Sequence, residues 1–155
     1  MTPAINQVRK AGVDHRVHEY QHDPSSESYG TEAAEKLGLS PEQVFKTLVV
    51  SLDGKTLAVG IVPVAGKLNL KQIAKAAGAK KAAMADPAEV ERVTGYVMGG
   101  VSPLGQKKRL ATFIDASAQQ YSTMHVSAGR RGLEIELAPD DLCRLTSARF
   151  AAIAG

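Results

Sequence analysis

Two apolar runs with only a short polar link between them constrain the fold of this chain more than any other feature. Residues 44–52 and 56–62 are rich in β-branched side chains, and Asp53-Gly54-Lys55 joins them. An Asp-Gly pair between such runs is typical of a β-hairpin, because both residues tolerate the positive φ angles of a tight turn. The sequence therefore predicts two antiparallel strands that pair with each other.

Lys46 lies inside the first of these strands. Side chains alternate along a strand, so Lys46 shares its face with the apolar Val44, Leu48 and Val50. An ammonium group on an apolar face is costly unless an anion or water meets it. Either Lys46 extends to solvent from a strand edge, or it lines a pocket for a ligand with a carbonyl or a phosphate group.

Hydrophobic periodicity and end signals predict the other elements. Helices are expected at 3–11 after a Thr2 cap, at 31–37 after a Thr31 cap, and at 70–77, 87–94, 139–145 and 148–154. Strands are expected at 13–20, 112–114, 123–126 and 133–137, and a polar loop at 21–30. Because strands and helices alternate without a regular βαβ period, we predict an α+β fold with a mixed, curled, barrel-like β-sheet surrounded by helices.

Composition limits the class of protein. With 155 residues and 44% hydrophobic content, the chain can build one core, so we expect a single domain over 1–155. We find no apolar run near the roughly 20 residues of a membrane span and no signal-peptide pattern. The single cysteine, Cys143, excludes an internal disulfide and is expected to be a core residue. We therefore expect a cytoplasmic protein without membrane contact.

Basic residues are bunched although the formal net charge is only +3. The clusters are Lys80-Lys81, Lys107-Lys108-Arg109 and Arg130-Arg131, each beside a glycine. Such clusters are either solvated faces or, next to flexible turns, a surface that follows the phosphates of a nucleic acid.

The motifs of common catalytic sites are missing. His18 and His22 are four residues apart with Asp23 adjacent, but in a strand that spacing separates two side chains by about 13 Å. No Gly-x-Ser-x-Gly nucleophile motif and no phosphate-binding Gly-x-x-x-x-Gly-Lys-Ser/Thr loop is present. We therefore expect no metal site and no cofactor.

The stretch from Gly99 to Gly105 offers backbone donors instead. Gly99 and Gly100 carry no side chain, so their N–H groups can turn toward a carbonyl or carboxylate oxygen, as in an oxyanion hole. Ser102 precedes Pro103, which holds its backbone extended and could aim its hydroxyl at a ligand. A plain structural turn is the alternative for the whole stretch.

These motifs, read in order, resemble the YbaK/EbsC family of aminoacyl-tRNA deacylases, which are relatives of the editing domain in bacterial prolyl-tRNA synthetase. The matching stretches are Met1-Thr2-Pro3-Ala4, His22-Asp23-Pro24, Phe45-Lys46-Thr47-Leu48, Lys80-Lys81, Met84-Ala85-Asp86-Pro87, Thr94-Gly95-Tyr96, the run from Gly99 to Arg109, Val126-Ser127 and Arg131-Gly132-Leu133. They span nearly the whole chain, and the run from Gly99 to Arg109 is the most specific.

The resemblance implies a curled, barrel-like sheet and removal of cysteine mischarged onto tRNA(Pro), in company with prolyl-tRNA synthetase. Sibling domains remove alanine, and a binding module without turnover is the other alternative. The residues and the resemblance together imply catalytic roles for Lys46, Gly99 and Gly100, substrate contacts by Tyr20, Thr47, Ser102, Pro103, Ser127 and Glu134, and tRNA contacts by Lys107, Lys108 and Arg109. Relatives can carry Asp where this chain has Glu134. The family is thought to use the substrate's own thiol as the nucleophile, through a cyclic thioester.

Overall fold

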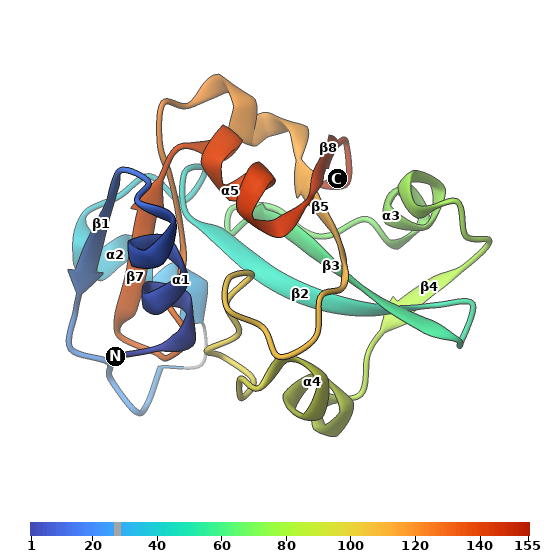
Figure 1. The fold of residues 1–155 in the computed structure, drawn as a ribbon, viewed down its shortest axis with the longest axis horizontal. Helices are drawn as coiled ribbons and strands as arrows, with labels where there is room; N and C mark the ends of the chain where they lie inside the picture. Colours follow the sequence, from blue (N-terminus) through green and yellow to red (C-terminus); the bar gives the residue numbers. More distant parts are fainter. Residues whose placement is uncertain (27–28) are drawn as a thin grey trace.

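The computed structural model describes the backbone of residues 1–26 and 29–155, with side chains from 31 onward after the gap (Figure 1). The predicted loop 21–30 lies partly outside these residues. The helices are α1 (Pro3–Ala11), α2 (Tyr29–Leu37), α3 (Leu70–Ala77), α4 (Pro87–Thr94) and α5 (Pro139–Thr146), with a 3-10 helix η1 (Ala116–Gln120). The strands are β1 (His15–Glu19), β2 (Phe45–Leu52), β3 (Thr56–Pro63), β4 (Ala82–Met84), β5 (Ala111–Asp115), β6 (Met124–Ser127), β7 (Leu133–Leu137) and β8 (Arg149–Ala151).

Local signals place most helix ends. The Thr2 side chain accepts a hydrogen bond from the Ile5 N–H, and α1 ends at Gly12 in the left-handed conformation. The same cap-and-glycine arrangement bounds α3, from Asn69 to Gly78. The predicted Thr31 cap is wrong, because α2 begins at Tyr29.

The predicted hairpin is confirmed and lies at the centre of the larger sheet. β2 and β3 pair antiparallel, with Leu52 opposite Thr56, and both Asp53 and Gly54 have positive φ. Strand order is β4-β2-β3-β5-β8 in this mixed sheet and β1-β7-β6 in an antiparallel one. An isolated parallel bridge between Val44 and His125 joins the two. The α+β class is confirmed, but the described strands do not close into a barrel.

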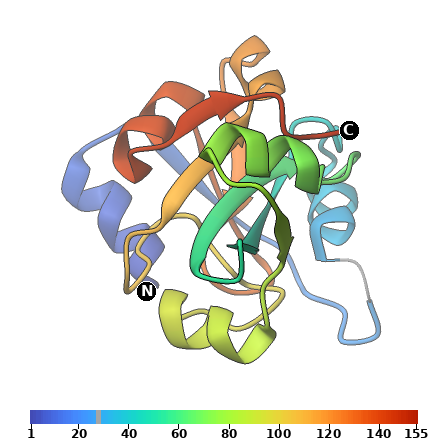
Figure 2. The same cartoon turned by 90° about the vertical axis from the view of Figure 1, so that its right-hand side faces the viewer.

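Helices cover both faces of these sheets, and Figure 2 shows α3 and α4 on opposite sides of the hairpin. The main core holds apolar side chains of α1, α4 and α5 against one face, which we call the inner face. On the opposite, outer face, α3 packs on β2 and β3, while Ala33 and Ala34 of α2 pack near Val44 and Tyr20. No described helix is long and apolar enough to span a bilayer.

The predicted C-terminal helix at 148–154 is wrong. β8 pairs in parallel with β5, and the Asp115 carboxylate then accepts the N–H groups of Ile153 and Ala154. The alanine-rich sequence favours a helix locally. Pairing with β5 instead gives hydrogen-bond partners to the backbone of this segment, and it also buries Ile153 in the core.

Candidate active site

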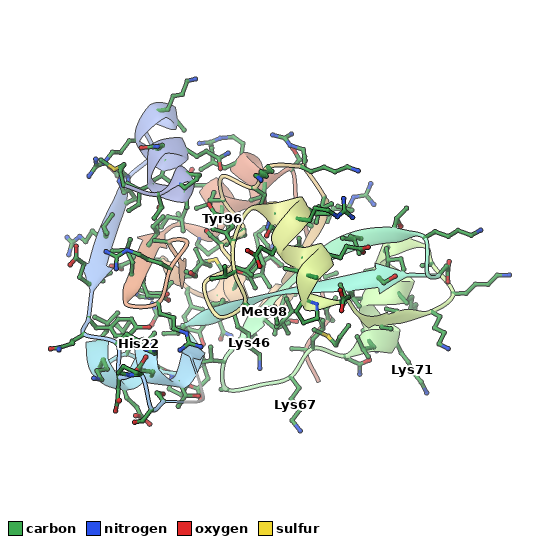
Figure 3. All side chains as sticks on the ribbon, turned by 90° about the horizontal axis from the view of Figure 1, so that it is seen from below. His22, Lys46, Lys67, Lys71, Tyr96 and Met98 are labelled. Atoms are coloured by element: carbon green, nitrogen blue, oxygen red, sulfur yellow. The ribbon has the colours of Figure 1, made fainter. Side chains whose placement is uncertain are left out.

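Lys46 is the centre of the candidate site. It lies on the outer face of β2, opposite Val62 of β3, and its side chain is half-buried (Figure 3). Burial lowers the pKa of Lys46, and the nearby ammonium of Lys67 lowers that pKa further. No carboxylate of the described residues forms an ion pair with it. At Lys46 the strand β2 pairs with β3, while β4 pairs with β2 only from Val50 to Leu52. The charge of Lys46 is available to a ligand.

Two further predicted residues share this face on neighbouring strands. If the parallel register at the Val44–His125 bridge is extended by two residues, Lys46 is placed beside Ser127 of β6. Ser127 is in turn opposite Glu134 of β7. With this extension, Lys46 and Glu134 would be two strand spacings apart, roughly 10 Å. We call Lys46, Ser127 and Glu134 the row of the candidate site, which has a cation at one end and a carboxyl group at the other.

Glu134 is an unusual carboxyl group. It is only 6% exposed, and no hydrogen bond or ion pair joins it to the described residues. Burial raises the pKa of Glu134 to about 8. The group is therefore largely protonated at neutral pH, and it can donate a hydrogen bond to a bound hydroxyl or oxyanion.

This pKa has a consequence for stability. Between about pH 4.5 and 8, the folded state holds a proton on Glu134 that the unfolded chain releases, so the free energy of unfolding falls as the pH rises. The contribution is up to about 1.4 kcal/mol per pH unit. We expect Glu134→Gln to remove this slope and to be more stable than wild type at pH 8. Urea unfolding at several pH values measures it. Glu19→Gln, which removes an exposed carboxylate of β1, is the control. An unchanged slope in Glu134→Gln contradicts the assignment.

Tyr20 borders the same region from the end of β1. Its N–H donates to the Gly132 carbonyl oxygen at 2.9 Å, which fixes the residue against the turn before β7. Burial raises the pKa of the Tyr20 hydroxyl, and the largest opposing effect is a hydrogen bond between that hydroxyl and the Gly132 backbone. The Glu134 carboxyl also raises the pKa of Tyr20. Tyr20 therefore stays protonated and can donate to a ligand held near Glu134.

A charged network supports the loop after Tyr20, and sequence reasoning did not find it. Glu32 is 4% exposed, and its two carboxylate oxygens accept from His22 Nδ1 at 2.6 Å and from the Asp23 N–H at 2.8 Å. Burial by itself raises the pKa of Glu32, but these hydrogen bonds outweigh it, so the pKa is lower than usual. The other ring nitrogen, His22 Nε2, lies 2.8 Å from Arg131 Nη1. The His22-Asp23-Pro24 motif was the available sequence signal.

The glycine loop corrects one expectation. The Gly100 N–H donates to the Val97 carbonyl oxygen at 3.0 Å, so this donor is already engaged in a turn. A Cβ on Gly100 would lie 3.0 Å from Arg130 Cα, which shows close packing against the turn that follows β6. Gly99, with φ +90, has no such bond among the described residues and remains the candidate donor. The structural-turn alternative therefore holds for Gly100.

Three other predicted substrate contacts are also corrected. Ser102 is fully buried, and its hydroxyl oxygen accepts the Leu104 N–H within a turn. Pro103 is buried beside α1, where it lines a different hollow together with Pro3. Thr47 faces the inner side of β2 because side chains alternate along the strand, and its buried hydroxyl has no partner. Ser127 stays on the outer face, although its hydroxyl oxygen accepts the Gly129 N–H.

The predicted tRNA-binding triplet is exposed. The Lys107 stem packs over Gly95, since a Cβ there would meet its Cγ at 3.1 Å. Lys107, Lys108 and Arg109 line a groove with Lys55 of the hairpin. Gly95 and Gly100 are five positions apart in the chain, so the Cα atoms of these two glycines are at most about 18 Å apart.

Comparison with protein families gives a consistent result. The model of the aminoacyl-tRNA editing domain matches residues 23–145. The chain is 40% identical over 153 residues to the "Putative Cys-tRNA(Pro)/Cys-tRNA(Cys) deacylase EbsC" of Enterococcus faecalis, covering 98% of this chain and 92% of that protein. It is 31% identical to the uncharacterized protein YwhH of Bacillus subtilis, covering 72% of this chain and 70% of YwhH.

Solved structures share the fold over the whole chain. A structure described as a "putative trans-editing enzyme for prolyl tRNA synthetase" has a TM-score of 0.83 and 26% identity, and covers 100% of this chain and 99% of that one. The hypothetical protein APE2540 has a TM-score of 0.88 at 24% identity, with 99% of both chains covered. The second likeness shows the fold alone.

Proposed function

Because this chain belongs to the aminoacyl-tRNA editing domain family, we propose that it is a trans-acting deacylase that removes cysteine mischarged onto tRNA(Pro). Its Enterococcus relative's name extends this to Cys-tRNA(Cys). The observation that carries the proposal is the row on the outer face, with the unpaired Lys46 cation at one end and the buried Glu134 carboxyl at the other.

The row contains no strong nucleophile, so the substrate supplies one. The cysteine thiol sulfur forms a bond to the ester carbonyl carbon, the bond from that carbon to the ribose oxygen breaks, and the thiol proton passes to the ribose hydroxyl. The cyclic thioester then hydrolyses in water. Holding thiol and carbonyl together contributes several kcal/mol. Lys46 stabilises the negative oxygen, with the Gly99 N–H as a second donor, while protonated Glu134 and Tyr20 hold the terminal ribose.

The decisive experiment compares substrates. Purified protein without synthetase should release cysteine from tRNA(Pro) at least about a hundredfold faster than serine from the same tRNA. The two side chains are nearly the same size and a pocket separates them poorly, whereas a thiol has a pKa of about 8.5 and a hydroxyl is far less acidic. Release of radiolabelled amino acid measures both rates.

Each other outcome has a clear meaning. Equal rates for cysteine and serine indicate an activated water and contradict the thiol mechanism. Preferred removal of alanine assigns the chain to the sibling class. Binding of the charged tRNA without release of any amino acid supports the binding module and contradicts the enzyme.

We further propose that Lys107, Lys108 and Arg109 contact acceptor-end phosphates, and that they affect affinity more than the chemical step. Replacing all three by glutamine should weaken tRNA binding and reduce the slope of log affinity against log salt by roughly 0.7 to 0.9 per lost phosphate contact. Filter binding at several salt concentrations measures the slope. Arg9→Gln/Arg16→Gln is the control for lost surface charge, and an unchanged slope in the triple variant places the triplet away from the tRNA.

We assign the whole chain, 1–155, to one editing domain, since its curated relative aligns over 98% of it. We propose prolyl-tRNA synthetase as its partner and the cytoplasm, where tRNA is charged, as its location.

A further inference from the structure

A second group of polar side chains lies on the outer face, beside the row of the candidate site. It consists of His18 on β1, His125 on β6 and Glu136 on β7. One ligand atom from each lies within 4.8 Å of the other two, and no other trio of this kind is found among the described residues. Sequence reasoning had considered His18 with His22 and Asp23, but the sheet brings His18 to residues more than a hundred positions away.

The three ligand atoms lie close enough together for one metal ion to replace the hydrogen bond that now joins His18 to Glu136. His18 Nε2 lies 2.8 Å from Glu136 Oε1, and His125 Nε2 lies 3.6 Å from the same oxygen. Ligands at 2.0–2.1 Å around a tetrahedral zinc ion are about 3.3 Å apart. Two imidazole nitrogens and one carboxylate oxygen therefore surround a point that a small dication can occupy after minor side-chain movement.

His125 makes the fewest side-chain hydrogen bonds of the three residues. Its side chain is only 3% exposed. Its Nδ1 has no hydrogen-bond partner among the described residues, and Nε2 is beyond normal hydrogen-bond length from Glu136. Buried polar groups are almost always paired. Because Nε2 makes no normal hydrogen bond, its lone pair is available to a metal ion, with the ring proton on Nδ1.

Glu136 is also held in the orientation that a ligand needs. Its second oxygen, Oε2, accepts a hydrogen bond from Thr123 Oγ1 at 2.7 Å, which leaves Oε1 directed at the two histidines. Such an outer partner is typical of metal-binding carboxylates. The His18 side chain is 31% exposed, so water can fill a fourth position.

We propose that His18, His125 and Glu136 form a binding site for a first-row transition-metal dication, with Zn²⁺ the ion that this set fits best. The ion ties β1 and β6 to β7, the strand between them. It also lies next to the candidate site, because Tyr20 is two residues after His18 and Glu134 is two residues before Glu136. Metal binding should therefore stabilise the folded protein.

The test uses full-length protein without a histidine tag, freed of metal by a chelator. We expect calorimetric titration with zinc chloride to show one saturable site, and added zinc to raise the thermal unfolding temperature. His125→Gln and Glu136→Gln should each weaken binding by at least about tenfold. His15→Gln is the matched control, because His15 is on the same strand and bonds only to the Val13 carbonyl oxygen. This control should bind zinc normally.

Cobalt provides a second measurement that needs no variant. A site with two histidines and one carboxylate gives Co²⁺ a visible absorption band that zinc displaces. The proposal is overturned if wild-type protein shows no saturable zinc site. It is also overturned if His15→Gln weakens binding as much as His125→Gln does. If His125→Gln does not fold, zinc binding by Glu136→Gln and the cobalt band of the wild-type protein decide whether the site exists. Glutamine keeps the shape of the Glu136 side chain.

Discussion

Replacing Lys46 by alanine should remove most of the deacylase activity and leave the protein folded. Lys46 is the cation of the outer-face row and has no carboxylate partner among the described residues, so its charge is free to stabilise the negative oxygen of the transition state. Losing one such group typically lowers kcat by a factor of about 10² to 10³. The same change relieves the cost of burying an unpaired ammonium, so stability should not fall.

Single-turnover release of cysteine from charged tRNA(Pro) measures the rate, and circular dichroism follows the fold. Lys67→Ala is the matched control, because it removes the neighbouring ammonium that lowers the pKa of Lys46 without removing Lys46 itself. It should reduce activity far less. Equal activity of wild type and Lys46→Ala, both folded, would exclude Lys46 from the chemistry.

Replacing Gly105 by alanine should cause the largest loss of stability in the glycine-rich stretch. Gly105 has φ +67, and a Cβ there would lie 2.5 Å from the Pro3 carbonyl carbon and 2.7 Å from the Ala4 nitrogen. The added methyl must push α1 away from the core, where this helix buries Ala4, Ile5 and Val8. We expect a loss of about 3 kcal/mol or more, which corresponds to roughly 6–12 °C in Tm for a chain of this length.

Gly12→Ala separates the two causes of this loss. Gly12 has nearly the same angle, φ +70, but a Cβ there meets nothing within 4 Å. It should therefore cost only about 1 kcal/mol, the strain of the left-handed backbone. Thermal unfolding of both variants measures the difference. If they lose the same stability, the predicted contact with α1 does not limit this position.

Several elements with a local cause were predictable from the sequence, although the Thr31 cap was wrong. The hairpin turn at Asp53-Gly54 and the caps at Thr2 and Gly78 depend on residues next to one another in the chain, and the structure confirms them. The resemblance that pointed to Lys46 is of the same kind, since its motifs are short continuous stretches. The family match over residues 23–145 agrees with it.

Contacts across the sheet were decided only by the tertiary structure. From the alternating pattern of its strand, Glu134 is expected at the surface. In the folded protein it is buried, and this burial raises its pKa to about 8. His125 meets His18 because β7 pairs with both of their strands. Likewise, the C-terminal segment becomes a strand because it pairs with the edge of β5 that β3 does not occupy. Each outcome depends on the free energy of strand pairing and burial between segments that are distant in the chain. Local secondary-structure propensity carries no information about these contacts.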